Sequence, residues 1–242
     1  MSNVIIRPRG AWAVAEVEPG PVCSACSGGG WTRELDAEGR TGRCACQRVV
    51  RRVALWNAAQ VPARHATSSF ESWQWMGGKD AALPLRQWVE GLDPAGVATG
   101  KMLVGDLGVG KTHLAVAALR HGVLERGIAA RFVDFGHLLH DMKGKLPTPG
   151  RSPAELAATA LLVLDDVPVL STDFERSLAD EIITRRYNGA GATIITSNAR
   201  ADTLDAVLGA RCASRVREMC PEILLRGLDH RSRVSALRGE SS

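Results

Sequence analysis

The motif GDLGVGKT, at residues 105–112, constrains the fold of this chain more than any other feature. It follows a short apolar run at residues 102–104 and precedes a helix-like segment that begins at His113. The spacing G-x-x-x-x-G-K-T lets successive backbone N–H groups turn inward on a phosphate chain, and glycines at the crowded points permit that turn. The motif therefore predicts a P-loop with its anion at a helix N-terminus. The expected nucleotide-binding residues are Gly105, Asp106, Leu107, Gly108, Val109, Gly110, Lys111, Thr112 and His113.

Two side chains of this motif have distinct expected roles. Lys111 can reach the β- and γ-phosphates as a mobile point charge, and the hydroxyl of Thr112 can ligate the Mg²⁺ that bridges them. A P-loop alone does not distinguish kinases, GTPases and motor ATPases, so the class of protein has to be inferred from the other residues of the site.

The size and composition of the chain limit what surrounds this motif. With 242 residues, there is room for one substantial α/β core and a small appendage, or for two modest domains. Hydrophobic residues make up 45% and charged residues 23%, which is typical of globular proteins. The net charge of +4 permits a polyanionic partner without requiring one. We see no signal peptide and no run that could cross a bilayer, so we expect a cytoplasmic protein without a membrane partner.

Composition divides the chain into three regions. Residues 1–50 are rich in Gly, Cys and Arg and show little sustained periodicity. This composition predicts a small loop-built module that needs a cross-link to be stable. Residues 51–95 are predicted to form a helical linker, with helices at 50–59 and 83–92. Four tryptophans fall there, and we favour packing over base stacking for them. They are Trp56, Trp73, Trp75 and Trp88.

Residues 96–242 alternate short apolar runs with amphipathic stretches, as expected of a parallel sheet covered by helices. The predicted fold class is therefore α/β, with five parallel strands. The expected strands are 102–104, 130–134, 161–165, 192–197 and 223–225, and the expected helices are 111–126, 136–143, 153–159, 173–188 and 202–218. Residues 143–152, with two prolines and two glycines, are predicted to form an exposed loop.

The acidic pair Asp165-Asp166 follows the apolar run at residues 161–164. Such a strand delivers Asp165 to the sheet edge, where it can hold the Mg²⁺ shell, while Asp166 can polarise a water toward the γ-phosphate. The alternative is a buried strand that ends in a solvated Asp-Asp turn. Together with the P-loop, the pair favours hydrolysis.

A later strand ends in the polar residues Thr196, Ser197 and Asn198. If it lies between the strands that carry the P-loop and the acidic pair, Asn198 can hydrogen-bond the attacking water or the γ-phosphate and act as a sensor. A simple Asn turn at a strand end is the alternative.

Arginines follow the sensor strand. Arg211 and Arg215 are four residues apart and share a helix face, so one of them could project into a neighbouring subunit's nucleotide site. The alternative is a solvated basic face. Arg226 or Arg231 could reach the nucleotide from the C-terminal end.

Taken in order, GDLGVGKTHLA, LLVLDDV, EIITRRYNGAGATIITSN, RCASR and RGLDHRSR resemble the AAA+ core of DnaC-type helicase loaders and their IstB-type relatives, over residues 60–235. The resemblance implies a sheet in 5-1-4-3-2 order, with ATP at the subunit junctions of an open or helical oligomer. It makes Lys111 and Thr112 P-loop ligands, Asp165 the Mg²⁺ ligand, Asp166 the catalytic carboxylate, Asn198 the first sensor and Arg215 the finger. Arg186 matches a family string but receives no role.

The chain departs from the AAA+ pattern at one catalytic position. Asp166 is shorter than the glutamate usual in these enzymes, which suggests slow, switch-like hydrolysis. Aspartate also occurs here in the loader group, so the substitution is compatible with activity.

The cysteines form a second motif, C-x2-C-x17-C-x-C, made by Cys23, Cys26, Cys44 and Cys46. Two close pairs can converge as four thiolates around a tetrahedral Zn²⁺, with the segment between them as a hairpin-like ribbon. A redox pair is the alternative. With four protein ligands the metal would be structural, and a module this small needs one to fold. Similar knuckles precede the ATPase core in some phage and bacterial DnaC-like proteins.

Two further cysteines lie far from this motif in the sequence, and a group of basic residues flanks it. Cys212 and Cys220 are expected to be packing residues. The basic residues Arg40, Arg43, Arg48, Arg51 and Arg52 flank the cysteine motif and could bind DNA phosphates, contact an acidic partner or solvate the module. The resemblance implies that the N-terminal region grips a replicative helicase.

The sequence thus favours an ATP-dependent accessory protein of DNA replication, a helicase loader that oligomerises on ATP and contacts single-stranded DNA. Its expected cofactors are ATP, Mg²⁺ and Zn²⁺. One alternative is an IstB-like transposition ATPase that assembles on double-stranded DNA and directs a transposase. Another is a nucleotide-dependent adaptor with little hydrolysis. A small-molecule kinase is disfavoured because no lid-like arginine segment follows the acidic pair.

Overall fold

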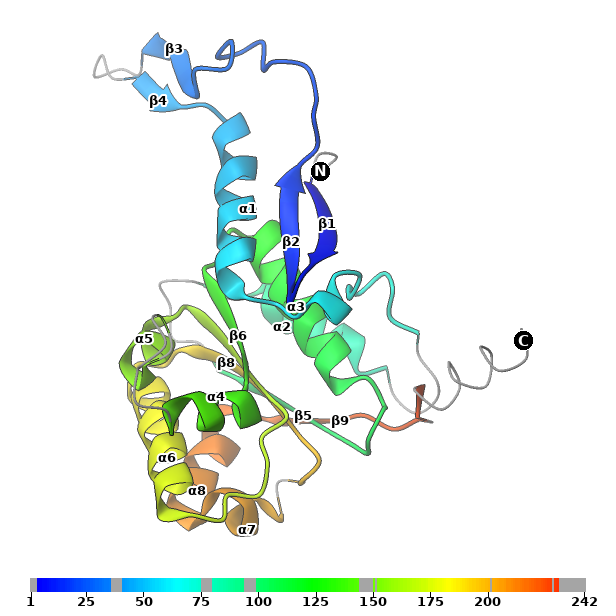
Figure 1. Cartoon of the computed structure of the whole chain (residues 1–242), viewed down its shortest axis with the longest axis vertical. Coiled ribbons are helices and arrows are strands. Elements are labelled where there is room, and N and C mark those ends of the chain that lie inside the picture. The colour runs from blue at the N-terminus through cyan, green and yellow to red at the C-terminus, as the bar shows by residue number, and fades with distance from the viewer. Residues whose placement is uncertain are drawn as a thin grey trace, which may run out of the picture.

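The P-loop region is built on a parallel sheet of five strands in the computed structural model of the chain (Figure 1). Its strands are β5 (Lys101–Val104), β6 (Ala130–Asp134), β7 (Leu161–Asp165), β8 (Ala192–Ser197) and β9 (Glu222–Leu224). The order β6-β7-β8-β5-β9 is the predicted 5-1-4-3-2 order read from the other edge. The predicted last strand, 223–225, lies one residue earlier than expected.

The structure describes residues 4–35, 41–74, 80–93, 99–143, 150, 152–200, 202–227 and 229–230. Trp75, Arg40, Arg231 and most of the predicted 143–152 loop lie outside these residues. Within them, no helix has the length and apolar character needed to span a membrane.

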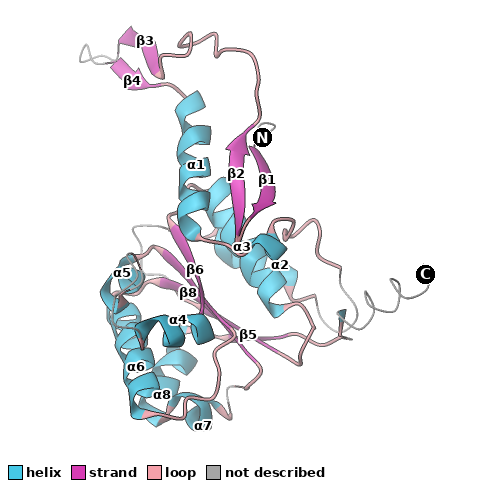
Figure 2. Ribbon diagram, viewed as in Figure 1, coloured by secondary structure: helices cyan, strands magenta, loops and turns pink. Residues whose placement is uncertain are grey.

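Alternating strand residues bury their side chains on opposite faces of the sheet, and so create two cores. Leu161 and Val163 pack with α3 (Lys111–Leu124) and α2 (Ala82–Glu90). Leu162 and Leu164 pack in the second core, which is covered by α4 (Phe135–Met142), α5 (Pro153–Ala158), α6 (Asp173–Asn188), α7 (Leu204–Leu208) and α8 (Ala210–Met219). Figure 2 shows the two helical layers on either side of the strands.

Gly209 divides the helix that the sequence predicted at 202–218. Its φ of 81° lies in the left-handed region, where a helix cannot continue, so α7 ends before it and α8 begins after it. The predicted single helix is therefore wrong, although both pieces pack in the second core.

An antiparallel hairpin, β1 (Val4–Arg9) and β2 (Trp12–Val17), occupies part of the region predicted to be loop-built. Ala13 and Ala15 are buried against α1 (Cys46–Ala59), where Trp56 Nε1 donates to Ala13 O at 2.8 Å. The side-chain amide of Asn57 exchanges two hydrogen bonds with the backbone of Ala15. The expectation of little strand structure in residues 1–50 is thus wrong, and the hairpin shares the hydrophobic core of the ATPase sheet.

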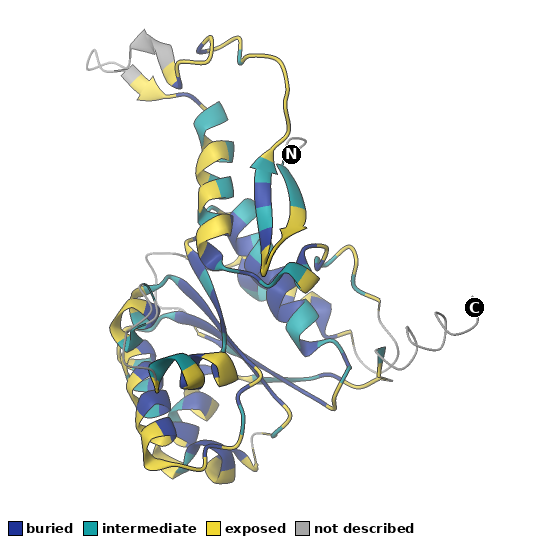
Figure 3. Cartoon of the chain, viewed as in Figure 1, coloured by how far each residue is buried: buried dark blue, intermediate teal, exposed yellow. Residues whose placement is uncertain are grey.

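The remainder of the N-terminal region stands away from that core. Strands β3 (Trp31–Leu35) and β4 (Thr41–Arg43) form a small ribbon at the outer end of α1 (Figure 1). Burial is concentrated at the opposite end of α1, at Trp56 and Ala59 (Figure 3). After α1, a short 3-10 helix, η1 (Ala63–His65), leads toward the P-loop.

The tryptophans that the structure describes in the linker serve as packing residues, as expected. Trp56 is fully buried, and Trp73 and Trp88 are partly buried against the first core. Trp88 also donates its indole N–H to Thr99 O at 3.0 Å.

Arg186, for which no role is predicted from the sequence, is a fully buried residue of α6. Its guanidinium donates to Thr193 Oγ1 and Ala157 O, at 3.0 Å each, and to the carbonyls of Thr159 and Ala192. Burial lowers its pKa to about 10, so the group stays charged near neutral pH. Arg186 thus ties the end of α5 and the start of β8 to α6, which is a structural function.

Candidate nucleotide site and four-cysteine cluster

The P-loop connects β5 to α3 with the backbone that its glycines permit. Gly108 and Gly110 have φ angles of 74° and 93°, a region that L side chains rarely adopt. Lys111 is buried, and its ammonium donates to the carbonyls of Gly105 and Asp106 at 2.8 Å each. The cation is therefore held at the mouth of the loop, next to the backbone amides that would surround a phosphate.

The two acids at the end of β7 have opposite environments. Asp165 is 1% exposed, and its carboxylate accepts from Thr112 Oγ1 at 3.1 Å and from Thr196 Oγ1 at 2.7 Å. Burial raises the pKa of Asp165, and the two hydroxyl donors oppose that rise. Asp166 is exposed and has a φ of 52°, the left-handed conformation that turns its side chain away from the strand path.

A cavity of about 270 Å³ joins these groups. The sequence-predicted residues that line it are Leu107, Gly108, Gly110, Lys111, Thr112, His113, Asp165, Asp166 and Asn198. β8 lies between β5 and β7, which is the arrangement that the sensor hypothesis for Asn198 required. The structure thus brings the P-loop, the acidic pair and Asn198 to one cavity at the carboxyl end of the sheet.

Four residues of this cavity were not predicted from the sequence: Arg64, His65, Thr196 and His230. Only Thr196 gave a local signal, as a hydroxyl on the sensor strand two residues before Asn198. Arg64 and His65 come from η1, and His230 comes from the C-terminal segment. Tertiary packing places them at the cavity, and no local sequence pattern predicts this position.

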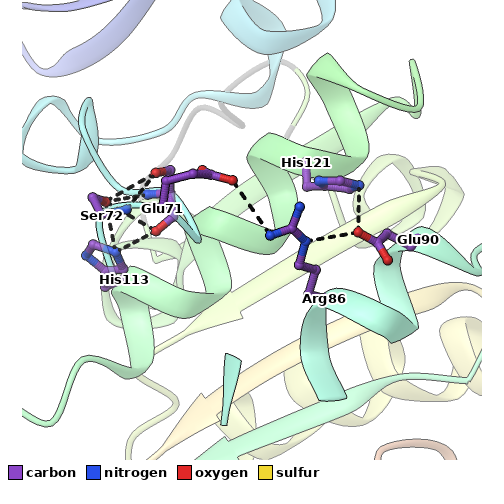
Figure 4. A network of polar contacts seen from close by, with 7 residues as sticks. Glu71, Ser72, Arg86, Glu90, His113 and His121 are labelled. Carbon is purple, nitrogen blue, oxygen red and sulfur yellow. Dashed lines mark hydrogen bonds and ion pairs between the residues drawn. The ribbon is translucent and has the colours of Figure 1, made fainter. Parts of the chain in front are cut away.

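The linker also borders the P-loop, along the first turn of α3. His113 Nε2 lies 3.0 Å from Ser69 O and 3.3 Å from Ser72 Oγ (Figure 4). Burial lowers the pKa of His113, which favours the neutral ring. The Trp73 ring lies 5.6 Å from that of His113 and fills the space that a Cβ at Gly110 would need.

An ion-pair network continues along the outer side of α3 (Figure 4). Arg86 contacts Glu90 at 3.0 Å and Glu71 at 3.9 Å, and Glu90 lies 4.0 Å from His121. This network joins α2 to the segment that carries Trp73, so the linker is fixed against α3.

The C-terminal segment reaches the P-loop through residues other than those expected. His230 N donates to Gly108 O at 3.2 Å, and the Asp229 carboxylate occupies the space of a Cβ at Gly108. Arg226 is exposed and does not line the cavity, and Arg231 lies outside the described residues.

These features fit a nucleotide with its Mg²⁺. The lining of the cavity supplies one ammonium, one guanidinium, two hydroxyls and two carboxylates, which are groups of the kinds that bind phosphate and Mg²⁺. The indole N–H of Trp73 is buried without a hydrogen-bond partner in the described part of the chain. It lines an adjoining cavity of about 200 Å³ with Gly110 and His113.

The arginines of α8 lie apart from this cavity. Arg215 Nη1 contacts Asp180 Oδ1 at 2.9 Å and Thr184 Oγ1 at 2.8 Å, both on α6. Arg211 is exposed. Neither residue lines the nucleotide cavity of its own chain, and the finger function of Arg215 stays a prediction.

The four cysteines of the N-terminal motif do converge. The Sγ atoms of Cys23 and Cys44 are 3.8 Å apart, those of Cys26 and Cys46 are 3.6 Å apart, and all four lie within 4.8 Å of one another. Tetrahedral zinc with Zn–S bonds of about 2.3 Å requires sulfur separations of about 3.8 Å. The cluster therefore fits a structural zinc site.

Local backbone groups support this cluster. Cys23 O accepts from the backbone N–H of Ser27 at 2.7 Å, which closes a turn around the first pair. The backbone of Gly30 lowers the pKa of the Cys26 thiol to about 7, while hydrogen bonding to Cys26 raises the pKa of Cys46 to about 12. Cys26 therefore supplies the thiolate that a metal requires more readily than Cys46 does.

The other two cysteines are packing residues, as expected. Cys212 and Cys220 are buried in the second core, and burial raises the pKa of each thiol to about 12.

The basic residues near the cluster differ in exposure and in contacts. Arg48 and Arg51 are exposed on α1, whereas Arg52 donates to Glu125 O at 2.8 Å. Arg43 lies over the Trp31 ring.

The sheet order, the P-loop and the acidic pair define a P-loop ATPase of the AAA+ class. A family model of the IstB-like ATP binding protein matches residues 42–242, and the chain belongs to this family. Its family is ATP-binding, which is consistent with ATPase activity.

Solved structures with this fold include replication proteins. The DnaC helicase loader is 29% identical, with a TM-score of 0.58 over 67% of this chain and 99% of that chain. DnaI is 22% identical, with a TM-score of 0.60 over 70% of this chain and 93% of that chain. The replication initiator DnaA, bound to AMPPCP and single-stranded DNA, is 22% identical, with a TM-score of 0.54 over 72% of this chain and 54% of that chain. No curated protein matches the sequence.

Proposed function

We propose that this chain is an ATP-dependent accessory protein of DNA replication that binds and remodels a replicative helicase and contacts single-stranded DNA. The proposal rests on one observation: the nucleotide cavity lies on the ATPase sheet, whereas the four-cysteine cluster lies away from it, at the outer end of α1. Such a layout separates an ATP site from a partner-binding module. The 29% identity with the DnaC helicase loader, over nearly all of that chain, supports it.

The N-terminal module would hold Zn²⁺ through Cys23, Cys26, Cys44 and Cys46 and would contact the helicase. We divide the chain into this module at residues 1–50, a helical linker at 51–95 and the ATPase domain at 96–242. Because the hairpin packs on the ATPase core, the part of the module that is free for a partner is the cysteine ribbon and the exposed face of α1.

The nucleotide cavity suits hydrolysis by residues of this chain. Lys111 and Thr112 would hold the phosphates and the Mg²⁺ shell, with Asp165 as the acidic Mg²⁺ ligand. Bound Mg²⁺ would neutralise charge on the β- and γ-phosphates. Asp166 is exposed to the cavity and would orient and deprotonate the attacking water, and Asn198, which lines the same cavity, would hydrogen-bond that water or the γ-phosphate. The short Asp166 side chain suits a slow, switch-like reaction.

A second subunit would complete this site. Since Arg215 does not reach the cavity of its own chain, it would act from a neighbouring subunit in an oligomer that forms on ATP binding. Such a finger can contribute about three to five orders of magnitude in rate. The ATP-bound oligomer would hold the partner, and hydrolysis would release it.

A second candidate function is favoured by the family match itself. The IstB-like model covers residues 42–242, so a transposition ATPase that assembles on double-stranded DNA and directs a transposase shares this core. The match contains Cys44 and Cys46 but begins after Cys23 and Cys26, so it does not account for the complete cysteine cluster. We therefore favour the loader function.

The deciding experiment is a pull-down of the full chain against the host's replicative helicase and, in parallel, against a transposase, with a non-hydrolysable ATP analogue or with ADP. We expect helicase capture that depends on the nucleotide. Transposase capture without helicase capture would support the alternative. Negligible phosphate release with DNA and helicase both present, despite tight ATP binding, would indicate an adaptor.

A Lys111→Ala variant provides the control for the nucleotide requirement. It should lose ATP binding and, with it, the nucleotide dependence of helicase capture. If Lys111→Ala bound ATP and released the helicase as the wild type does, the switch mechanism would be wrong.

A further inference from the structure

Arg64 enters the nucleotide cavity from the linker on a backbone that is fixed at both ends. Val61 O accepts from Ala13 N at 2.8 Å, and Ala63 N donates to Ala11 O at 2.9 Å. Beyond η1, Ala66 O accepts from Arg120 Nη1, on α3, at 3.3 Å. The position of Arg64 is therefore set jointly by the N-terminal hairpin and by the P-loop helix.

The guanidinium of Arg64 keeps donors available. Its Nε donates to His65 Nε2 at 3.1 Å. No carboxylate in the described part of the chain pairs with it, and the side chain is exposed to the cavity. A guanidinium has five N–H donors, so most of them remain for an anion.

The neighbours of Arg64 place it on one side of the cavity. Arg64 also lines a second cavity of about 320 Å³, together with Asp134. Asp134 pairs with Asp165 in the register of β6 and β7. Arg64 is thus on the side of the acidic pair, where the terminal phosphate and Mg²⁺ of a P-loop nucleotide lie.

The positive charge of Arg64 indicates what its side chain can bind in the cavity. Among the described residues that line the nucleotide cavity, Lys111 and Arg64 are the only lysine and arginine, and Asp165 and Asp166 oppose them. Lys111 is held against the carbonyls of Gly105 and Asp106, at the mouth of the P-loop. A terminal phosphate beside Asp166 would need a second cation, and Arg64 supplies one within the same chain.

We propose that Arg64 binds the terminal phosphate of ATP in cis and so makes this chain discriminate ATP from ADP. Arg64 also links the nucleotide state to the N-terminal hairpin, because Pro62, two residues earlier, forms a β-bridge with Trp12 at the hairpin turn. This function of Arg64 depends on the cavity being an ATP site, as proposed above, but does not depend on the identity of the partner.

The experiment measures the affinity of the purified full chain for a non-hydrolysable ATP analogue and for ADP, both with Mg²⁺. Arg64→Ala should weaken the ATP analogue by about 10- to 100-fold, the range of a charge-assisted hydrogen bond, and leave ADP within about twofold. Arg64→Lys should recover part of the loss. The matched control is Arg185→Ala, an exposed arginine paired with Glu181 away from the cavity, which should change neither affinity.

Equal weakening of both nucleotides would show a structural function of Arg64 and overturn the proposal, as would unchanged affinities. Hydrogen exchange provides a second readout. Residues 4–17 should exchange more slowly with the ATP analogue than with ADP in the wild type, and this difference should vanish in Arg64→Ala. Its absence in the wild type would refute the link to the hairpin. These outcomes are separate from the helicase pull-down, which can fail while Arg64 still discriminates the nucleotides.

Discussion

Thr196 and Asp165 are joined by a hydrogen bond of 2.7 Å, in which the Thr196 hydroxyl donates to the carboxylate. The same hydroxyl accepts the backbone N–H of Asp166 at 2.8 Å. One side chain of β8 therefore positions both acids at the end of β7: the last strand residue, Asp165, as the buried Mg²⁺ candidate, and the residue after the strand, Asp166, as the exposed catalytic candidate.

Replacing Thr196 by Val should weaken the binding of Mg²⁺–nucleotide by about tenfold at pH 7. The hydrogen bond favours the charged form of Asp165, so its loss raises the Asp165 pKa further above the ordinary value. A raised pKa means that protons compete better with Mg²⁺, and the deficit should therefore grow as the pH falls from 8 to 6. Titrations of Mg²⁺-dependent ATP binding across this range test it. Thr203→Val, which removes a hydroxyl bonded to Arg200 O, is the control, and a deficit independent of pH would contradict the assignment.

Cysteine substitutions should separate metal binding from nucleotide binding. The wild type should contain about one zinc ion per chain, and Cys26→Ser should lose most of it. ATP affinity should change less than twofold, because α1 is anchored on the ATPase core by Trp56, at the end away from the cluster. Metal analysis and nucleotide titration of the same preparations measure both. Cys212→Ala, at a buried cysteine of the second core, should keep its zinc. Full zinc content in Cys26→Ser would refute the site.

Arg215 can be tested by mixing subunits. Arg215→Ala and Asp166→Asn should each lose most ATP hydrolysis while still binding ATP. A mixture should recover a measurable fraction of the rate, because the Asp166→Asn subunit supplies the arginine to the intact site of the other. No recovery would mean that Arg215 serves only its ion pair with Asp180. In that case Asp180→Ala should reproduce the Arg215→Ala defect.

Removing the charge of Arg186 should destabilise the chain. Arg186→Met leaves the acceptors at Ala157, Thr159, Ala192 and Thr193 without their donor. Since an unsatisfied buried group costs about 1–3 kcal/mol, we expect a loss of roughly 2–4 kcal/mol in the free energy of unfolding by urea. The neighbouring exposed substitution Arg185→Met should cost less than about 0.5 kcal/mol. Equal stability of the two variants would contradict the structural function of Arg186.

Glu175 should make stability depend on acid pH. Lys143 at 2.9 Å, with the backbone N–H groups of Ser171 and Thr172, lowers the pKa of Glu175 from 4.5 to about 2. A lowered folded-state pKa stabilises the protein above pH 4.5, and this contribution is lost as the pH falls toward 2.

Melting temperatures of the wild type and of Glu175→Gln measure this effect. Their difference should be largest near pH 7 and should shrink below pH 4.5. Glu181→Gln, at an exposed pair with Arg185, should differ little from the wild type throughout this range. A constant gap between the wild type and Glu175→Gln would show that the carboxylate charge is not the cause.

The parts of this molecule that the sequence predicted best are those with strong local signals. Strand β7, LLVLD, is buried along its whole length and could be recognised as an apolar run. Helix α6 begins after Thr172 with a capping box and occupies the predicted 173–188. The P-loop and acidic pair were identified by spacing, because phosphate and Mg²⁺ chemistry restricts the residue types at each position.

Features that depend on contacts distant in sequence were missed. The β1–β2 hairpin has short strands, and β1 contains Pro8 with arginines on either side, so it lacks a clear alternation. Its strands are stabilised by burial of Ala13 and Ala15 on α1. Alanines give only a weak sequence signal for a buried strand, because their side chains are small. Arg64 reaches the cavity because η1 is fixed by this same hairpin, so its location could not be foreseen while the hairpin was unrecognised.

The length of α1 sets how far a small change at the nucleotide end can travel. With 14 residues, the helix is about 21 Å long, and its two fully buried residues, Trp56 and Ala59, lie near the inner end. A tilt of about 10° at that anchor would sweep the cysteine ribbon through about 4 Å, by the geometry of a rod of this length. Helix α1 can thus serve as a lever that converts sub-ångström adjustments beneath the hairpin into a displacement comparable to the diameter of an amino-acid side chain.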